Sequence, residues 1–239
     1  MNQILVTEKL YVTPGLKRKK RLYKIEFFIS IFLVFLLSSY YIYAEYDRNK
    51  SEQVSQALLS EVKAEDNTIK EPSTNEPIII VLSENEAEEV SEEVNEVVKD
   101  TQIGDKTYST EAIITIPKID ISYPVLSETS DELLEISVNR YWPQKGKMKP
   151  NEVGNYCIVG HNYRNGKMFG RLHELKNKDV VYLEDMSGKK IKYEVYDKYV
   201  VEPTDTRCTS QRTNGRKELT LITCTNYGTQ RLVVKCREA

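Results

Sequence analysis

The sequence predicts a mostly β protein, with a closed or nearly closed β-barrel and short helices preceded by a transmembrane helix and a stalk. Many short strand-like runs and only two short helices fill the C-terminal half of the 239-residue chain, a pattern typical of a barrel. An uncharged apolar run lies near the N-terminus, and an acidic segment separates it from the strands. We therefore expect a cytoplasmic basic tail (1–22), a transmembrane anchor (23–46), an acidic flexible stalk (47–106) and the barrel domain (107–239).

The uncharged run 27–44 is the expected membrane anchor. Its length lies at the lower end of the range of about 17 to 25 residues that a helix needs to cross a bilayer. Basic residues at 17–21 precede the run and acidic residues follow it, so the positive-inside rule places the N-terminus in the cytoplasm and the later residues outside. A cleaved signal peptide is the alternative, but the run is long and Ile42-Tyr43-Ala44 matches a cleavage site poorly. A buried core helix fits less well, because the run has no polar face.

The net charge of −2 conceals an uneven distribution, but no large basic surface is implied. The sequence therefore argues against a nucleic-acid partner. Residues 47–105 are rich in Glu, Ser, Asn and Lys, a composition that buries too little apolar surface to offset the entropy of ordering. We expect a solvated spacer here, with two patches left open. Residues 53–62 have helical spacing, and the apolar run 77–82 can pair as a strand or dock on the domain.

Within the barrel domain, alternating apolar residues predict strands, and prolines or turn residues predict where they end. Strands are expected first at 112–117 and 119–125, and Ser130 is expected to cap a short helix that carries Leu133, Leu134, Ile136 and Val138. A loop at 144–154 then leads into a strand that ends at His161, and a second short helix is expected at 168–175. Further strands are expected at 180–183, 190–201, 219–224 and 231–236, with a turn at Ser187-Gly188.

A thiol and a guanidinium flank the short loop 225–230. If this loop closes a hairpin, Cys224 lies roughly opposite Arg231, and directly opposed residues have Cβ atoms about 4.5–5.5 Å apart. Arginine is a permanent donor for a developing oxyanion or for a carbonyl that must be held. Its charge also favours the thiolate, which is the nucleophilic form of cysteine. The hairpin alone therefore predicts a charge-assisted thiol.

The chain contains only two histidines, so a candidate base is easy to name. A nucleophilic cysteine needs a base for its own proton and an acid for a leaving amine. His161 ends a predicted strand at a loop, and alternation puts Cys157, Val159 and His161 on one face. We expect His161 to emerge at the barrel edge, while Cys157 and Val159 on the same face cover the core. His173 is expected to be a non-catalytic surface or packing residue.

Each candidate also has an ordinary structural explanation: a surface histidine, a core cysteine and an arginine paired with a carboxylate. Their joint occurrence, in the order His, Cys, Arg and beside readable strands, favours a site. Met168, Phe169 and Leu172 are expected to be core-facing anchors. Cys157 and Cys236 lie in apolar runs and are expected to be small buried residues, and a bridge between Cys208 and Cys236 is left open. No cofactor is expected, and no carboxylate cluster for a metal can be assigned.

Gly160-His161, the strand Leu219-Thr220-Leu221-Ile222-Thr223-Cys224 and the strand Arg231-Leu232-Val233-Val234 resemble the three signature regions of sortases. Sortases are membrane-anchored cysteine transpeptidases of mainly Gram-positive bacteria, and the resemblance covers about residues 112–236. It implies an eight-stranded β-barrel in which Cys224 attacks the peptide bond inside a C-terminal sorting signal of LPxTG type. His161 is then the general acid/base, and Arg231 positions the substrate and stabilises the oxyanion. The implied partners are surface proteins with sorting signals, an amine of a peptidoglycan precursor or a pilin, and the lipid bilayer.

The resemblance leaves the subclass open. Pilus-building members often carry an aromatic lid before the barrel and a second hydrophobic tail. We expect no lid, because Trp142-Pro143 stands in the wrong place for one, and no second tail. Residues 202–217 are short for the helical insertion of some cell-wall members, although residues 166–170 are similar to that group. A housekeeping, class D-like or class B-like enzyme is expected. The alternatives are a non-enzymatic binding module on a stalk and a papain-type protease. The chain order weakens the second, because the cysteine precedes the histidine in papain-type proteases and follows it here.

Overall fold

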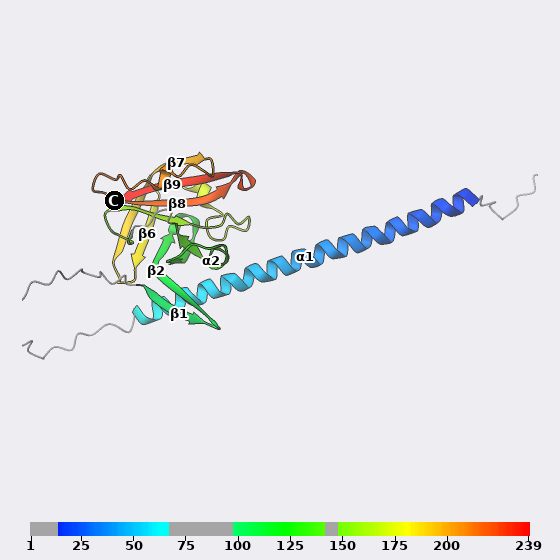
Figure 1. Ribbon diagram of the computed structural model, residues 1–239, viewed down its shortest axis with the longest axis horizontal. Coiled ribbons are helices and arrows are strands. Elements are labelled where there is room, and N and C mark those ends of the chain that lie inside the picture. The colour runs from blue at the N-terminus through cyan, green and yellow to red at the C-terminus, as the bar shows by residue number, and fades with distance from the viewer. Residues whose placement is uncertain (1–13, 67–97, 142–147) are drawn as a thin grey trace, which may run out of the picture. The chain divides into compact units, whose positions relative to one another are not determined.

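The computed structural model describes residues 14–66, 98–141 and 148–239. The chain divides into two compact units, residues 1–49 and 50–239. A single helix, α1 (Pro14–Asp66), contributes residues to both units (Figure 1).

The first unit consists, within the described residues, of the N-terminal part of α1. In the part of the chain that the structure describes, α1 is the one helix long and apolar enough to cross a membrane, and its most apolar window has a mean hydropathy of 2.0. Its large apolar side chains between Leu22 and Tyr46 are exposed on all sides. A helix that is apolar all round suits a hydrocarbon environment, and the expected anchor at 23–46 lies within it.

The second unit is built on a closed ring of eight strands, which confirms the predicted barrel. The ring order is β2-β3-β4-β5-β8-β9-β7-β6, and β6 pairs back with β2. Most neighbours are antiparallel, whereas the pairs β3–β4 and β5–β8 are parallel. In chain order the strands are β2 (Lys106–Ile116), β3 (Ile121–Leu126), β4 (Val138–Arg140), β5 (Gly154–Val159), β6 (Val180–Asp185), β7 (Lys190–Val201), β8 (Lys217–Thr225) and β9 (Gln230–Glu238).

Buried hydrophobic side chains from the strands fill the barrel, so its interior is a packed core. Ile114, Ile158, Leu221 and Val234 are fully buried and belong to one hydrophobic cluster. Met168, Phe169 and Leu172 join that cluster, which confirms the prediction that they anchor their segment in the core.

Short helical turns connect the strands: α2 (Asp131–Ile136), η1 (Pro117–Ile119), η2 (Leu172–Glu174), η3 (Arg207–Thr209) and η4 (Asn226–Gly228). The Ser130 hydroxyl accepts a hydrogen bond from the Leu133 amide at 3.1 Å, which confirms the predicted cap. The helix predicted at 168–175 is reduced to the turn η2. Before η2 the chain folds tightly on itself, and a Cβ at Gly170 would lie 2.1 Å from the carbonyl oxygen of Tyr163.

The compact unit begins earlier than the expected residue 107. The C-terminal part of α1 (residues 50–66) and strand β1 (Lys99–Ile103), which pairs with β2, both belong to it. Residues 50–66 are therefore a packed helix and not the expected solvated spacer. The helical spacing at 53–62 had indicated a helix in this segment. The runs 77–82 and 142–143 lie outside the described residues. Apolar contacts join Leu58 to Tyr108 and Leu126, and Leu59 and Val62 to Ile113.

All four cysteines are free thiols, so Cys208 and Cys236 form no bridge in this structure. Cys157 and Cys236 are buried, as predicted, and Cys208 is buried as well. Burial raises the pKa of Cys157 to about 12 and also raises the pKa of Cys236 well above the usual range for a thiol. These thiols are therefore poor nucleophiles.

Candidate active site

The parallel pair β5–β8 brings His161 level with Cys224. Val159 lies opposite Ile222 in the register of this pair, and the same register continued for two residues places His161 beside Cys224. Two hydrogen bonds continue the pairing beyond Val159. The Gly160 amide donates to the Ile222 carbonyl at 3.2 Å, and the Thr223 hydroxyl donates to the Gly160 carbonyl at 2.7 Å.

Residue 160 must be a glycine for this arrangement. A Cβ at this position would lie 2.8 Å from a Val138 methyl carbon and 3.0 Å from the Phe169 ring. Because both neighbours are fully buried, neither has room to retreat. The glycine therefore lets the segment that carries His161 lie directly on the core.

The hairpin between β8 and β9 places Cys224 opposite Arg231, as the sequence predicts. The turn η4 closes this hairpin with three consecutive residues at positive φ: Asn226 (47°), Tyr227 (56°) and Gly228 (87°). Left-handed backbone is costly for residues other than glycine and is concentrated at functional sites. The turn directs the Gly228 carbonyl at Arg231, whose Nη1 donates to it at 2.9 Å.

The guanidinium of Arg231 is held by backbone carbonyls. Besides the bond to Gly228, Nη1 donates to the carbonyl of Gln230 at 3.1 Å. Within the described residues Arg231 makes no ion pair with a carboxylate. Its positive charge is therefore available to a neighbouring thiolate or to a substrate oxygen.

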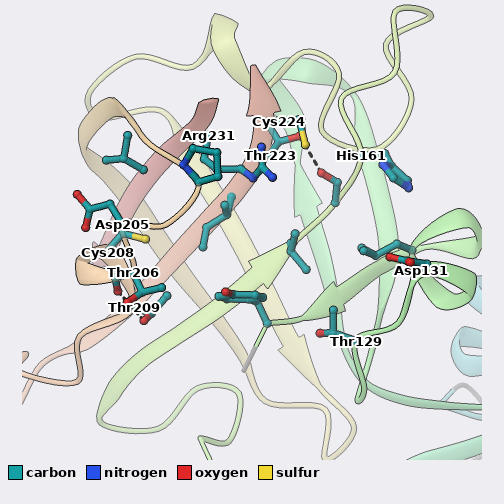
Figure 2. A pocket seen from close by; sticks show the side chains of 17 residues that line it. Thr129, Asp131, His161, Asp205, Thr206, Cys208, Thr209, Thr223, Cys224 and Arg231 are labelled. Atoms are coloured by element: carbon teal, nitrogen blue, oxygen red, sulfur yellow. Dashed lines mark hydrogen bonds between the residues drawn. The ribbon is translucent and has the colours of Figure 1, made fainter. Parts of the chain in front are cut away.

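Cys224, His161 and Arg231 line one groove with a volume of about 360 Å³. Figure 2 shows Cys224 between Arg231 on one side and His161 on the other, where His161 lies toward the segment that carries Asp131. The groove is lined by both polar and apolar side chains. Its other lining residues come from α2 and the segment before it (Thr129, Asp131, Leu134), from strands β5, β7 and β8 (Val159, Val201, Ile222, Thr223), from positions directly after β4 and β5 (Tyr141, Gly160) and from the β7–β8 connection (Pro203, Asp205, Thr206, Cys208, Thr209).

His161 is oriented from the α2 side of the groove and makes no hydrogen bond with Cys224 in this structure. Its Nε2 lies 3.4 Å from Oε1 of Glu135, and its ring centroid lies 5.2 Å from that of Tyr163. The Tyr163 hydroxyl in turn donates to Oε2 of Glu135 at 2.8 Å. Hydrogen bonds between a nucleophile and its base are often long before substrate binds. The imidazole is partly exposed, whereas its Nε2 atom is buried.

Three residues beside His161 were missed by the sequence reasoning. Asn162 donates its side-chain amide to the carbonyl oxygen of Cys224 at 2.7 Å, so the loop after His161 is tied to the end of β8. Its place directly after His161 is a signal that could have identified it. Glu135 and Tyr163 carried no such signal, because an acidic residue on a short helix and a tyrosine in a loop are both ordinary.

The β7–β8 connection brings a permanent negative charge to the groove. The side chain of Arg207 donates to Asp205, and this hydrogen bonding, together with that of the Arg207 amide, lowers the pKa of Asp205 to about 2. The carboxylate is therefore ionised throughout the physiological range. Asp205 and Arg231 line the same groove, so the cavity presents both signs of charge to a bound peptide.

The second histidine has no place in the groove. His173 lies exposed on η2 and is absent from the groove lining. Among the described residues no group of three His, Cys, Asp or Glu side chains has an arrangement that could hold a metal ion.

A family model described as the sortase domain matches residues 114–239, more than half of the chain. The chain belongs to the sortase family. It is therefore a cysteine transpeptidase, and this membership excludes both the non-enzymatic binding module and the papain-type protease as its class.

Solved sortase structures resemble this sortase over about half of its length. Sortase A from Corynebacterium diphtheriae is 30% identical with a TM-score of 0.50, covering 55% of this chain and 61% of its own. The sortase D5 transpeptidase of Clostridium perfringens is 27% identical, with a TM-score of 0.49 and coverages of 54% and 79%. Sortase C-1 from Actinomyces oris is 32% identical, with a TM-score of 0.48 and coverages of 54% and 73%. Curated protein sequences give no match.

The assignment of this sortase as a housekeeping, class D-like or class B-like enzyme stays a prediction.

Proposed function

We propose that this sortase cleaves a C-terminal sorting signal of LPxTG type through a thioester on Cys224 and transfers the protein to an amine. The observation that supports this most strongly is the meeting of Cys224, Arg231 and His161 in one groove. The two neighbours of the thiol supply what acyl transfer needs, a proton carrier and a fixed donor for negative charge.

In the first half-reaction the Cys224 thiolate attacks the carbonyl carbon of the scissile peptide bond. The negative charge that develops on the carbonyl oxygen is stabilised by the guanidinium of Arg231. The carbon–nitrogen bond then breaks, and His161 gives its proton to the leaving amine. The products are a thioester on Cys224 and the released C-terminal fragment of the sorting signal.

In the second half-reaction an amine attacks the thioester carbonyl and His161 accepts its proton. The carbon–sulfur bond breaks, and Cys224 leaves as a thiolate. The acceptor is an amine of a peptidoglycan precursor or of a pilin lysine, and water in its place gives hydrolysis. Surface proteins with sorting signals and one of these amine acceptors are thus the proposed partners.

The location of these partners agrees with the proposed topology. The apolar part of α1 is the single-pass anchor, the basic residues before it lie in the cytoplasm, and residues 50–239 lie outside the cell. Protease added to intact cells should then digest the barrel unit. If the unit is digested only after the cells are broken, the topology is reversed.

The reaction is tested with the full chain in detergent micelles and a panel of sorting peptides. Products formed with and without an added amine, either oligoglycine or diaminopimelate, are separated and identified by mass spectrometry. We expect cleavage inside the LPxTG-like motif and, with amine, a product in which the N-terminal fragment carries that amine.

Three variants and two matched controls complete this test. Cys224→Ala and His161→Ala should abolish cleavage, and Arg231→Ala should lower kcat/KM by about 10²–10³-fold, the usual effect of removing an oxyanion donor. His173→Ala and Arg212→Ala remove an exposed histidine and an exposed arginine outside the groove and should behave as wild type. Cleavage by Cys224→Ala at the wild-type rate would refute the proposal.

A further inference from the structure

The hydroxyl of Tyr123 joins the helix next to the membrane anchor to the loop after His161. Tyr123 lies on β3 and is 4% exposed. It donates to the carboxylate of Glu52 on α1, at 3.0 Å to Oε2 and 3.2 Å to Oε1. Its oxygen accepts the amide of Met168 at 3.2 Å. Burial, and less strongly the nearby Glu52 charge, raises the pKa of Tyr123 to about 12, so the phenol keeps the proton that it donates.

Met168 is the residue through which this contact reaches the site. Its backbone is left-handed, with φ of 49°, a strained conformation that persists only where the surroundings enforce it. Met168 forms an isolated β-bridge with Asn162, and the amide of Phe169 donates to the carbonyl of His161 at 3.0 Å. The backbone at Met168 and Phe169 therefore sets where the loop places His161.

The part of α1 that carries Glu52 is fixed by contacts of its own. Leu58 is fully buried against Tyr108 and Leu126. The same cluster includes Leu133 and Ile136 of α2, and α2 also carries Glu135, which faces His161. Glu52 itself is oriented by Gln56, whose side-chain amide donates to Oε1 at 2.9 Å. These contacts hold α1 in the position from which the Glu52 carboxylate accepts the Tyr123 hydroxyl.

We propose that Glu52 and Tyr123 are positioning residues for the transfer reaction, acting on His161 through Met168. This inference rests on the proposed function in one respect, the role of His161 as acid and base. The part of α1 that carries Glu52 would then contribute to catalysis as well as to stability.

The chemistry of the contact explains why its loss should reach the site. Without the Tyr123 oxygen the buried amide of Met168 has lost its acceptor, and an unpaired buried donor is costly. The left-handed turn at Met168 then has less to hold it, and the loop 162–168 opens more often. Small displacements of a proton carrier reduce turnover strongly, whereas they affect substrate binding less.

The test compares variants of the full chain in lipid nanodiscs. Tyr123→Phe removes the hydroxyl and keeps the ring. Glu52→Ala removes the acceptor at a position where alanine favours the helix, and Glu52→Gln restores an oxygen acceptor without the charge.

Two controls match these changes. Glu61→Ala alters an exposed glutamate of the same helix. Tyr196→Phe removes another tyrosine–glutamate hydrogen bond, the 3.1 Å bond to Glu218, which lies outside the groove lining.

Two quantities are measured for each variant: amide hydrogen exchange of the peptide covering residues 162–169, and kcat and KM with a sorting peptide. In Tyr123→Phe and Glu52→Ala we expect exchange at least about 10-fold faster and kcat about 10-fold lower, with KM within about two-fold. Glu52→Gln should recover much of both losses, and the double variant should lose no more than Tyr123→Phe because the two residues act in series. The two controls should match wild type.

Wild-type exchange and wild-type kcat in both Tyr123→Phe and Glu52→Ala would overturn the proposal, even if the melting temperature fell, because the contact would then only stabilise the fold. If the wild-type protein turned over no sorting peptide, the proposed function would fail by itself. Hydrogen exchange would then decide the inference alone: faster exchange in the loop of both variants supports it, and unchanged exchange refutes it.

Discussion

The side-chain amide of Asn162 donates to the carbonyl oxygen of Cys224 at 2.7 Å. This bond connects the first residue after the proposed acid/base to the backbone of the proposed nucleophile. It forms just beyond Val159 and Ile222, the last residue pair in the register of β5 and β8, where the sheet no longer joins the two segments. The relative position of His161 and Cys224 is therefore secured by a side chain.

Asn162→Ala should lower kcat/KM without unfolding the protein. Asn162 is exposed, and a hydrogen bond of this kind contributes about 1 kcal/mol, which corresponds to roughly 5-fold. The kinetics with a sorting peptide and the melting temperature should be measured together. Gln102→Ala, an exposed amide on β1, is the control. A fall in melting temperature with unchanged kinetics would show that the bond has no catalytic consequence.

Glu135→Gln should slow turnover in a salt-dependent way. The carboxylate lies 3.4 Å from Nε2 of His161 and attracts the imidazole only when the ring is protonated. Both side chains are partly exposed, so dissolved ions screen the attraction. We expect a loss of about 2- to 5-fold at low ionic strength that shrinks toward 1 M salt. A loss of equal size at every salt concentration would point to a packing role instead.

Cys224 should react with iodoacetamide before the buried thiols do. Cys224 is partly exposed and lies opposite Arg231, whereas burial raises the pKa of Cys157 to about 12 and so removes the reactive thiolate. At pH 7.5 the native protein should be labelled at Cys224 first. Cys157 should stay unlabelled even at pH 9 until the protein unfolds. Peptide mapping by mass spectrometry gives the order, and early labelling of Cys157 would contradict the packed core.

Leu58→Ala should destabilise the barrel unit, although the residue lies far before the strands in sequence. Leu58 is fully buried against Tyr108 and Leu126, and removing a buried leucine side chain costs about 3 kcal/mol. Urea unfolding of the full chain in micelles, followed by the β-sheet circular dichroism signal, measures this. Gln53→Ala on an exposed face of the same helix is the control. Equal midpoints for the two variants would mean that the helix adds nothing to the barrel.

The parts of the fold that were predicted correctly are those with strong local patterns. The alternation and the turn in residues 219–236 predicted the β8–β9 hairpin and hence the pairing of Cys224 with Arg231. Strand β4 was missed because three residues are too few to alternate, and Val138 was assigned to the preceding helix. The cap at Ser130 was predicted because a cap is decided by its nearest neighbours.

The missed parts depend on contacts between distant residues. No local pattern reveals that β5 and β8 are parallel neighbours, so the alignment of His161 with Cys224 rested on the family resemblance. The polar composition of residues 47–105 suggested a spacer, whereas the buried face of the helix at 50–66 is only a few residues wide. The contact between Glu52 and Tyr123 spans 71 positions, and neither residue stands out in the sequence.

The thioester mechanism is tested most directly by intact-protein mass spectrometry of the enzyme shortly after it is mixed with a sorting peptide and no added amine. We expect a mass increase equal to the N-terminal part of the cleaved peptide, mapped to Cys224 and removed when an amine is added. The adduct should be absent in His161→Ala and Cys224→Ala. An adduct on a different residue, or cleavage that proceeds with no adduct in an enzyme lacking the Cys224 thiol, would contradict the thioester mechanism.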